Sequence, residues 1–354
     1  MLLNFKDKVI SSIISVIPDK KIKFESGMKN YNFSKDQNLK LKKIMGFGAR
    51  HVAKKKMTVS DLSIHGIKFL IKKNIIKKKD IGAIILVTQT PDHIIPPTSN
   101  IIQSKLNLSN NTLCLDINQG CAGYLIGLMV SFNILNLKKF KKILLINADV
   151  LSKKVSKFDR NSHPLIGDAA TISVVENKKN EKIFLSLNMD GKNANFLKIP
   201  AGGIKIPFSK FTSKLKTDKS GNKRSLENLF MKGDEVYLFI MNTVPKMIES
   251  ILKKNKLYLE QIKYFFFHQP NKFILKKLSE KMNIDEDKMP NNIVGMYGNS
   301  SGASIPINIC KNFKKKSTRK DNLVCLAGFG VGLTWASMII NLSSLKFKKI
   351  IKLS

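Results

Sequence analysis

Residues 116–128 read DINQGCAGYLIGL, and the prediction of the fold starts here. The run that leads into this stretch, residues 112–118, predicts a buried strand, and an apolar helical pattern follows Cys121. The small residues from Gly120 to Gly123 allow a tight turn between strand and helix. Such a turn places Cys121 at or near a helix N-terminus, where unpaired N–H groups and the helix dipole favour a thiolate. From this stretch alone, a core cysteine chosen to fit between glycines is an equal alternative.

On both sides of this stretch, short β-rich runs alternate with helical patterns, which indicates an α/β fold. A loop-like segment rich in Gly, Ser and Lys, residues 200–226, divides the chain into two parts. The elements of the two parts follow a matching order, which suggests an internal duplication. The predicted strands are 83–90, 112–118, 142–150, 170–176, 264–269, 322–330 and 332–340, and a further helix is predicted over about 271–282.

The composition limits the classes of protein that the chain can belong to. Its 354 residues can bury a large core, and its formal net charge is +37. Only four of the 62 basic residues are Arg, the preferred reader of bases and phosphates, and Lys is spread along the whole chain. We therefore interpret the charge as a solvated Lys-rich surface that would attract an acidic partner, and we expect no nucleic-acid binding. Neither a signal peptide nor a spanning helix is evident, so we expect a cytoplasmic protein without stable membrane insertion.

The remaining cysteines and histidines give no sign of a metal site. The four cysteines are far apart and lack the CxxC spacing, so we predict free thiols, no disulfide framework, no metal and no cofactor. We interpret all but Cys121 as small buried hydrophobic residues: Cys114, Cys310 and Cys325. Four histidines lie in polar or mixed surroundings and are interpreted as structural or surface residues: His51, His65, His93 and His163.

Two further polar residues are candidates for catalysis. His268 ends the aromatic run YFFFHQ, and a position at the carboxyl end of a buried strand is where α/β folds place ligand-facing groups. Asn299 lies in the tight loop GNSSGAS before a helix of small residues. Taken singly, each has an ordinary alternative: a core histidine bonded to backbone for His268, and a turn asparagine for Asn299. The Gly-rich turn AGFGVGLTW (327–335) is either a simple hairpin or a source of backbone N–H groups for an anion.

These segments together resemble the ketoacyl synthase III family, the 3-oxoacyl-[acyl carrier protein] synthases of the thiolase superfamily that start fatty-acid chains. The resemblance covers about residues 46–340, and the segments occur in the order of the family. The matching segments are TPDHIIPPT (90–98), CAGY (121–124), GDAAT (167–171), MKGDEVYLF (231–239), HQPN (268–271), GNSSGAS (298–304) and GFGVGLTW (328–335).

The resemblance implies a five-layered αβαβα thiolase fold built from two duplicated halves, residues 1–180 and 181–354, and a homodimer. It implies that Cys121 carries the acyl group as the nucleophile, and that His268 and Asn299 bind the malonyl donor during decarboxylation. It also implies that the backbone N–H groups of Cys121 and Val331 form the oxyanion hole of an acyltransferase.

The implied reaction is a decarboxylative Claisen condensation of an acyl thioester with malonyl-[acyl carrier protein], in fatty-acid biosynthesis or related lipid metabolism. Family members that use coenzyme A carry a Trp, and an Arg four residues later, where this chain has Lys40 and Ile44. This departure favours acyl transfer from the carrier protein, with coenzyme A left open as a donor. Two alternatives remain: an acyltransferase that makes esters or amides in a specialised pathway, and a non-catalytic dimer partner or binding module. Beyond about residue 342 a basic tail is expected as an addition, either a solvated strand or a frayed helix.

Overall fold

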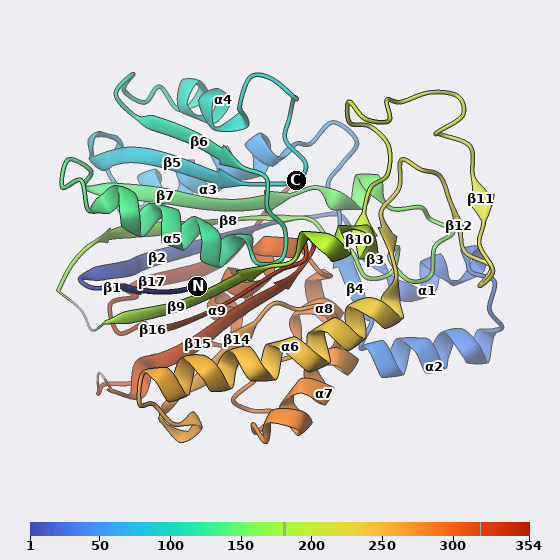
Figure 1. Ribbon diagram of the computed structural model, residues 1–354. Coiled ribbons are helices and arrows are strands. Elements are labelled where there is room, and N and C mark those ends of the chain that lie inside the picture. The colour runs from blue at the N-terminus through green and yellow to red at the C-terminus, as the bar shows by residue number, and fades with distance from the viewer. Residues whose placement is uncertain (180–181, 319) are drawn as a thin grey trace.

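The structure, a computed structural model, describes residues 1–179, 182–318 and 320–354. The elements form five layers, in which helices and sheets alternate (Figure 1). Helices α3 and α4 cover one sheet, α5 and α9 lie between the two sheets, and α6 and α7 cover the other sheet. The expected five-layered α/β fold is therefore confirmed.

The first sheet has six strands in the order β17-β2-β8-β7-β5-β6. Strand β5 is parallel to β6 and β7, whereas β8 is antiparallel to β7 and β2. The carboxyl ends of β5, β6 and β7 therefore meet at one edge, where open α/β sheets bind ligands. The bounds of the six strands are β2 Lys8–Pro18, β5 Ile81–Val87, β6 Leu113–Ile117, β7 Lys142–Asp149, β8 Ala169–Asn177 and β17 Phe347–Leu353.

The second sheet has five strands in the order β1-β9-β16-β15-β14. Its strands are β1 Leu2–Phe5, β9 Ile183–Met189, β14 Tyr264–Phe267, β15 Leu323–Gly330 and β16 Thr334–Asn341. Three two-stranded ribbons pair β3 Lys21–Lys23 with β4 Ala49–His51, β10 Leu197–Lys198 with β13 Phe230–Met231, and β11 Lys216–Thr217 with β12 Lys223–Arg224.

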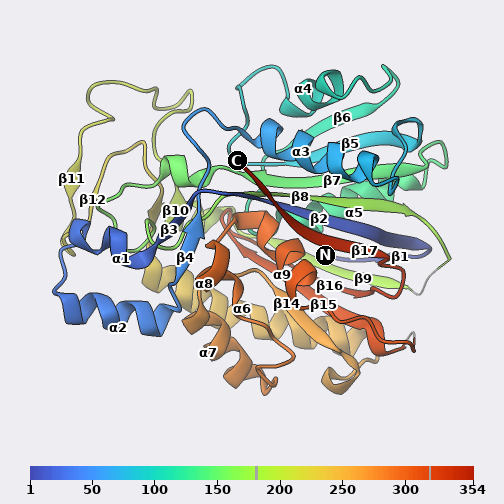
Figure 2. The ribbon, with the colours of Figure 1, turned by 180° about the vertical axis from the view of Figure 1, so that it is seen from behind.

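The two ends of the chain each join the sheet of the other half. Strand β1 pairs with β9 in the second sheet, and β17 pairs with β2 in the first. Figure 2 shows β17 running along β2 on the rear side of the molecule. The basic tail is thus a strand, one of the two forms expected for it. The expected boundary between the halves, at residues 180 and 181, lies outside the described residues.

The helices differ in how much of their surface is apolar, and this follows from their layer. Helix α5 is apolar almost all round because it lies between the two sheets, whereas α3 buries one face only. Across the described ranges, no helix combines the length and the apolar character needed to cross a membrane. The helices are α1 Phe24–Gly27, α2 Lys35–Met45, α3 Val59–Lys72, α4 Thr98–Lys105, α5 Gly123–Leu135, α6 Gly233–Lys254, α7 Lys272–Met282, α8 Ile293–Tyr297 and α9 Ser304–Asn312.

Most predicted strands lie within one to three residues of the observed ones, but the prediction that residues 112–118 form a buried strand was wrong. Strand β6 lies at the edge of its sheet, and Leu113 and Leu115 are 40% and 39% exposed. Asp116 faces the other way and accepts hydrogen bonds from the first N–H groups of α4. Because side chains alternate along a strand, the leucines must point to the opposite, partly uncovered face.

Candidate active site

Cys121 lies in the turn between β6 and α5, as the sequence predicts. Helix α5 begins at Gly123, and the residue before it, Ala122, caps it without a side-chain hydrogen bond. The turn packs so tightly that a Cβ atom at Gly120 would lie 2.5 Å from side-chain atoms of Gln89 and Val331. A Cβ atom at Gly330 would lie 2.6 Å from the Cys121 sulfur. The two glycines therefore allow the backbones of two separate turns to meet at the thiol.

The ionisation of the thiol differs from the expectation. Cys121 is half-buried, and desolvation raises the pKa of its thiol to about 11. The backbone N–H groups of Val331 and of Cys121 itself oppose this effect and lower the pKa by a smaller amount. Burial in a low-dielectric site therefore opposes the thiolate more strongly than the donors at the helix terminus favour it.

The same two N–H groups are those that the resemblance assigns to the oxyanion hole. Val331 lies in the turn between β15 and β16, which form the antiparallel hairpin expected around residues 327–335. Both N–H groups lie close enough to the Cys121 sulfur to stabilise its anion. Backbone donors fixed at this position would also reach the oxygen of a carbonyl group bonded to the sulfur.

His268 follows β14 and is 2% exposed. Its Nδ1 lies 2.8 Å from the Ser304 hydroxyl oxygen, which also accepts the Gln269 N–H at 3.3 Å. Burial lowers the pKa of His268 to about 4, so the ring is neutral at neutral pH. When the Ser304 hydroxyl donates to Nδ1, the proton of the neutral ring lies on Nε2, which can then donate a hydrogen bond.

Asn299 lies between α8 and α9 and is 8% exposed. Its Oδ1 accepts a hydrogen bond of 2.9 Å from the Ser301 N–H. The loop itself is fixed by a bridge to Ile166, with the Asn299 N–H donating to the Leu165 carbonyl at 2.8 Å. Because Oδ1 is occupied, the amide presents its Nδ2 donor to a ligand.

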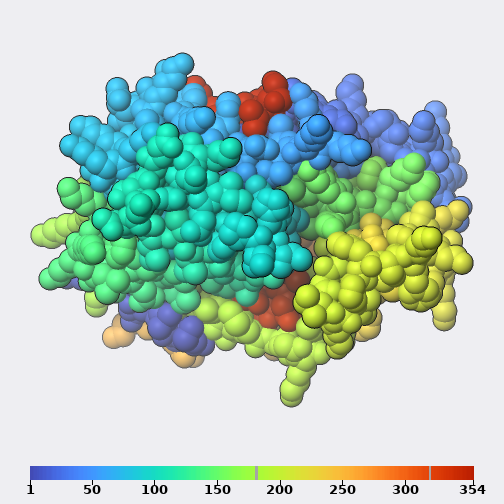
Figure 3. All heavy atoms as spheres, turned by 90° about the horizontal axis from the view of Figure 1, so that it is seen from above, coloured from blue at the N-terminus to red at the C-terminus, as the bar shows by residue number. Residues whose placement is uncertain are grey.

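Cys121 and Asn299 line the same cavity, which has a volume of about 220 Å³. Figure 3 shows a hollow in the surface where the teal and yellow parts of the chain meet. Most of the other residues that line the cavity are apolar. The remaining lining residues are Gln89, Asn118, Leu151, Ser162, Leu165, Ile166, Leu197, Lys198, Ile199, Leu229, Met231, Ser301 and Val331.

Comparison with known proteins agrees with this site. Two family models match: 3-oxoacyl-[acyl-carrier-protein (ACP)] synthase III over residues 115–192 and its C-terminal counterpart over residues 252–342. A putative 3-oxoacyl-[acyl-carrier-protein] synthase 3 of Campylobacter jejuni is 33% identical over 99% of this chain and 98% of its own length. The chain belongs to the 3-oxoacyl-[acyl-carrier-protein] synthase III family.

Further relatives of this synthase III-family protein support the same conclusion. A beta-ketoacyl-[acyl-carrier-protein] synthase III of Fusobacterium nucleatum is 34% identical over 83% of this chain and 87% of its own. A 3-oxoacyl-(acyl-carrier protein) synthase structure from Burkholderia xenovorans superposes with a TM-score of 0.90 at 30% identity, covering 100% of this chain and 99% of that one. The protein is therefore an enzyme of the synthase III type, a transferase in the broad sense. The alternatives of an ester- or amide-forming acyltransferase and of a non-catalytic module are not favoured.

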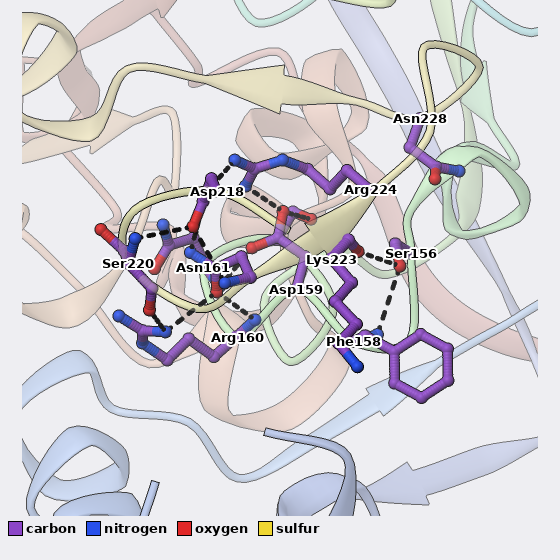
Figure 4. Close-up of polar contacts among 12 residues, drawn as sticks. Ser156, Phe158, Asp159, Arg160, Asn161, Asp218, Ser220, Lys223, Arg224 and Asn228 are labelled. Carbon is purple, nitrogen blue, oxygen red and sulfur yellow. Dashed lines mark hydrogen bonds and ion pairs between the residues drawn. The ribbon is translucent and has the colours of Figure 1, made fainter. Parts of the chain in front are cut away.

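A network of polar side chains supports one wall of the synthase III cavity (Figure 4). Arg224 on β12 forms ion pairs with Asp218 and with Asp159, the latter at 3.0 Å. Asp159 also accepts a hydrogen bond of 2.8 Å from Ser162, which lines the cavity. The segment 200–226, predicted as a loop, is thus joined to the body of the protein by buried polar contacts.

Two of the other histidines, His51 and His163, are structural residues, as expected. His163 lies between Arg50 Nη2 at 2.6 Å and the Tyr31 hydroxyl at 2.8 Å, and His51 Nδ1 lies 2.6 Å from the Pro18 carbonyl oxygen. Cys310 and Cys325 are buried as predicted. Cys114 is only half-buried because it lies on the edge strand β6.

Sequence reasoning missed two polar residues beside Cys121. Asp149 ends β7, beside the carboxyl end of β5, and Ser301 lies within the quoted loop GNSSGAS. A carboxylate at the end of the buried run KILLINAD was a usable signal, because charged residues are rarely buried without a partner. The contribution of Ser301 depends on its backbone conformation, which the residue pattern does not reveal.

Proposed function

We propose that the protein condenses an acyl group held on Cys121 with malonyl-[acyl carrier protein] and releases carbon dioxide and a 3-oxoacyl thioester. The observation that carries the proposal is that Cys121 and Asn299 line one apolar cavity, while His268 lies behind its wall, with the carbonyl of the lining residue Ser301 at its ring. Cys121 follows β6, His268 follows β14, and Asn299 precedes α9. Packing alone requires no such combination of a thiol, an imidazole and an amide.

In the first half-reaction, the Cys121 sulfur attacks the carbonyl carbon of an acyl thioester. The bond from that carbon to the leaving sulfur breaks, and the proton of the Cys121 thiol ends on the released thiol. The oxyanion formed on the way accepts hydrogen bonds from the N–H groups of Cys121 and Val331, whose positions beside the sulfur support this role.

In the second half-reaction, the malonyl thioester loses its carboxylate as carbon dioxide. The electron pair of the broken bond forms an enolate, whose oxygen is stabilised by His268 Nε2–H and Asn299 Nδ2–H. The enolate carbon attacks the acyl carbon on Cys121 and expels the Cys121 thiolate, which takes up one proton. The neutral state of His268 supports this role, because the enolate needs a donor at neutral pH.

The acyl donor is proposed to be a carrier protein rather than coenzyme A. Lys40 and Ile44, which stand where coenzyme A-dependent relatives have Trp and Arg, lie on α2, and Ile44 is 55% exposed. Neither side chain can stack on an adenine ring. Carrier proteins are acidic, so the net charge of +37 would attract them.

Intact-mass spectrometry tests the nucleophile. Incubation with an acyl-carrier donor should add one acyl group to the wild-type protein and none to Cys121→Ala, and acyl-coenzyme A should acylate the wild type more slowly. Cys114→Ala is the matched control, because Cys114 is also a half-buried residue but lies on the edge strand β6. A Cys121→Ala protein acylated to the wild-type extent would falsify the assignment.

Salt tests the donor. The rate with a carrier-bound substrate should fall as ionic strength rises, whereas the rate with a short free thioester should not. Equal sensitivity of the two rates to salt would remove the argument from charge.

The protein is further proposed to be a cytoplasmic homodimer. Strand β6 leaves its outer backbone edge without a partner strand in the described chain, and Leu113 and Leu115 are partly exposed along it. Ile94 and Ile95, 84% and 82% exposed, add apolar surface nearby in sequence. Light scattering should give the mass of two chains for the wild type and of one chain for Leu115→Lys. An unchanged mass in Leu115→Lys would place the interface elsewhere.

The proposed cytoplasmic location is supported by the free thiols, which fit a reducing compartment.

A further inference from the structure

Ser301 lies at the centre of the site and contacts each of the three proposed active residues. Its N–H donates to Asn299 Oδ1 at 2.9 Å, and its carbonyl oxygen lies at the His268 ring and favours the protonated form. Its side chain lines the cavity together with the Cys121 thiol. The short helical turn Ser301–Ala303 packs against both β7 and α5, the elements that carry Asp149 and follow Cys121.

The backbone of Ser301 is strained. Its φ angle is +53°, in the left-handed region that residues with a Cβ atom rarely adopt. Glycine would occupy this position without strain, and the following residue is Gly302. Strain of this kind persists at functional sites, so the hydroxyl at this position calls for an explanation.

The hydroxyl of Ser301 is buried beside two acidic groups. Ser301 is 5% exposed, and its Oγ makes no well-directed hydrogen bond to any atom of the described chain. It nevertheless lies close enough to the Cys121 thiol and to the Asp149 carboxyl to stabilise the anion of each. A buried hydroxyl without a partner costs free energy, which a ligand or an anion formed during the reaction can recover.

Asp149 lies on the other side of this hydroxyl. It is 3% exposed, and its Oδ1 accepts hydrogen bonds from the Thr88 hydroxyl, the Gln89 N–H and the Thr90 hydroxyl, at 2.8–3.2 Å. The carboxylate is thus held rigidly at the end of β7. Its negative charge disfavours a second negative charge on the Cys121 sulfur.

We propose that Ser301 and Asp149 are positioning residues that set the reactivity of Cys121: the Ser301 hydroxyl donates to the sulfur anion, and Asp149 competes for that same proton. The proposal rests on Cys121 being the nucleophile. The sulfur is anionic when it attacks the thioester and again when the enolate expels it. At both moments the hydroxyl turns toward the sulfur and donates a hydrogen bond, without giving up its proton.

Alkylation of Cys121 by iodoacetamide, followed by mass spectrometry between about pH 7 and pH 9, tests the proposal. In Ser301→Ala the loss of one hydrogen bond to the sulfur anion raises the pKa of the thiol and lowers the thiolate population about tenfold. The thiolate that remains is about threefold more nucleophilic, because the pKa of its thiol is higher. The tenfold loss of thiolate should therefore slow alkylation only about threefold. In Asp149→Asn, which keeps the Oδ1 acceptor, the loss of the charge should make alkylation faster by a similar factor.

Ser300→Ala is the matched control, because the Ser300 hydroxyl is equally buried and lacks a partner among the described atoms. It should be alkylated at the wild-type rate. Ser301→Gly separates positioning from structure: glycine relieves the strained φ, so thermal stability should equal or exceed the wild type while alkylation slows as in Ser301→Ala. A Ser301→Gly protein alkylated at the wild-type rate, or equal rates in all four variants, would overturn the proposal. If the wild type forms no acyl-Cys121 at all, the proposed function fails, whatever these rates are.

Discussion

Replacing Asp149 with Asn should stabilise the protein near neutral pH, and the gain should depend on pH. Burial raises the pKa of Asp149 from 3.8 to about 6, despite its hydrogen bonds from Thr88, Gln89 and Thr90. The folded state therefore binds this proton more tightly than the unfolded state does. The substituted amide side chain would have the same shape and keep an oxygen acceptor, but would carry no charge to bury.

The sign follows from the direction of the pKa change. Because the pKa is higher in the folded state, the unfolded chain loses this proton first as pH rises, and the free energy of unfolding falls between about pH 4 and pH 6. Above that window the loss is complete and amounts to about 3 kcal/mol. At about pH 4.5 the loss is about 1 kcal/mol, so the advantage of Asp149→Asn should shrink by about 2 kcal/mol on acidification.

Urea unfolding of both proteins at about pH 7.5 and pH 4.5 measures this difference. Subtracting the two proteins at each pH cancels the buried histidines, His163 and His268, whose lowered pKa values destabilise both proteins in acid. A difference in stability between a protonated carboxyl and an amide that does not depend on pH is the same at both pH values. It therefore cancels when the two stability differences are compared. A stability difference that is the same at both pH values would show that Asp149 is not buried as a charge, and would refute the reasoning.

Three further predictions concern the same site and its wall. Gly330→Ala should abolish acylation of Cys121 while the protein stays folded, because its Cβ would lie 2.6 Å from the sulfur; an acyl-enzyme yield within about twofold of wild type would contradict this. Arg224→Met should lower the free energy of unfolding, measured in urea, by about 3 kcal/mol, because it leaves the buried Asp159 without its cation. Adding Asp159→Asn to Arg224→Met should recover part of this loss. Malonyl decarboxylation by Cys121→Ala protein, followed as carbon dioxide release, should keep its rate down to about pH 5, since burial lowers the pKa of His268 to about 4; a rate that halves near pH 6.5 would indicate an ordinary histidine.

The order of elements and the place of each candidate residue could be predicted because they depend on local patterns. The turn around Cys121 follows from small residues between a strand and an apolar helix, and it is found there. The aromatic run before His268 predicts its strand end, and the glycines around Val331 predict the hairpin. The roles of these residues came from the resemblance rather than from the pattern, and they remain proposals.

The burial of residues 112–118 and the ionisation of Cys121 could not be predicted, because they depend on neighbours that are distant in the sequence. The run around Leu115 is apolar enough for a central strand, but its place in the sheet is decided by which strands pair, and β6 is left at the edge. The expectation that the turn favours a Cys121 thiolate considered only the terminus of α5. The pKa of the thiol is raised by burial against the turn between β15 and β16 and by the charge of Asp149, neither of which is adjacent in the chain.

A thiol that stays protonated at neutral pH is compatible with rapid acyl transfer. The thiolate of a weakly acidic thiol is intrinsically more nucleophilic, so a raised pKa costs less rate than the loss of thiolate suggests. The donors around Cys121 are held by the backbone and need no rearrangement when charge develops on the sulfur or on the oxyanion. Interactions that strengthen only as that charge forms lower the barrier, whereas a stabilised resting thiolate would lower the ground state as well. The site of this synthase therefore stabilises the sulfur anion when it forms during the reaction. In the resting state, the negative charge of Asp149 offsets the effect of the Ser301 hydroxyl, so the thiol stays protonated.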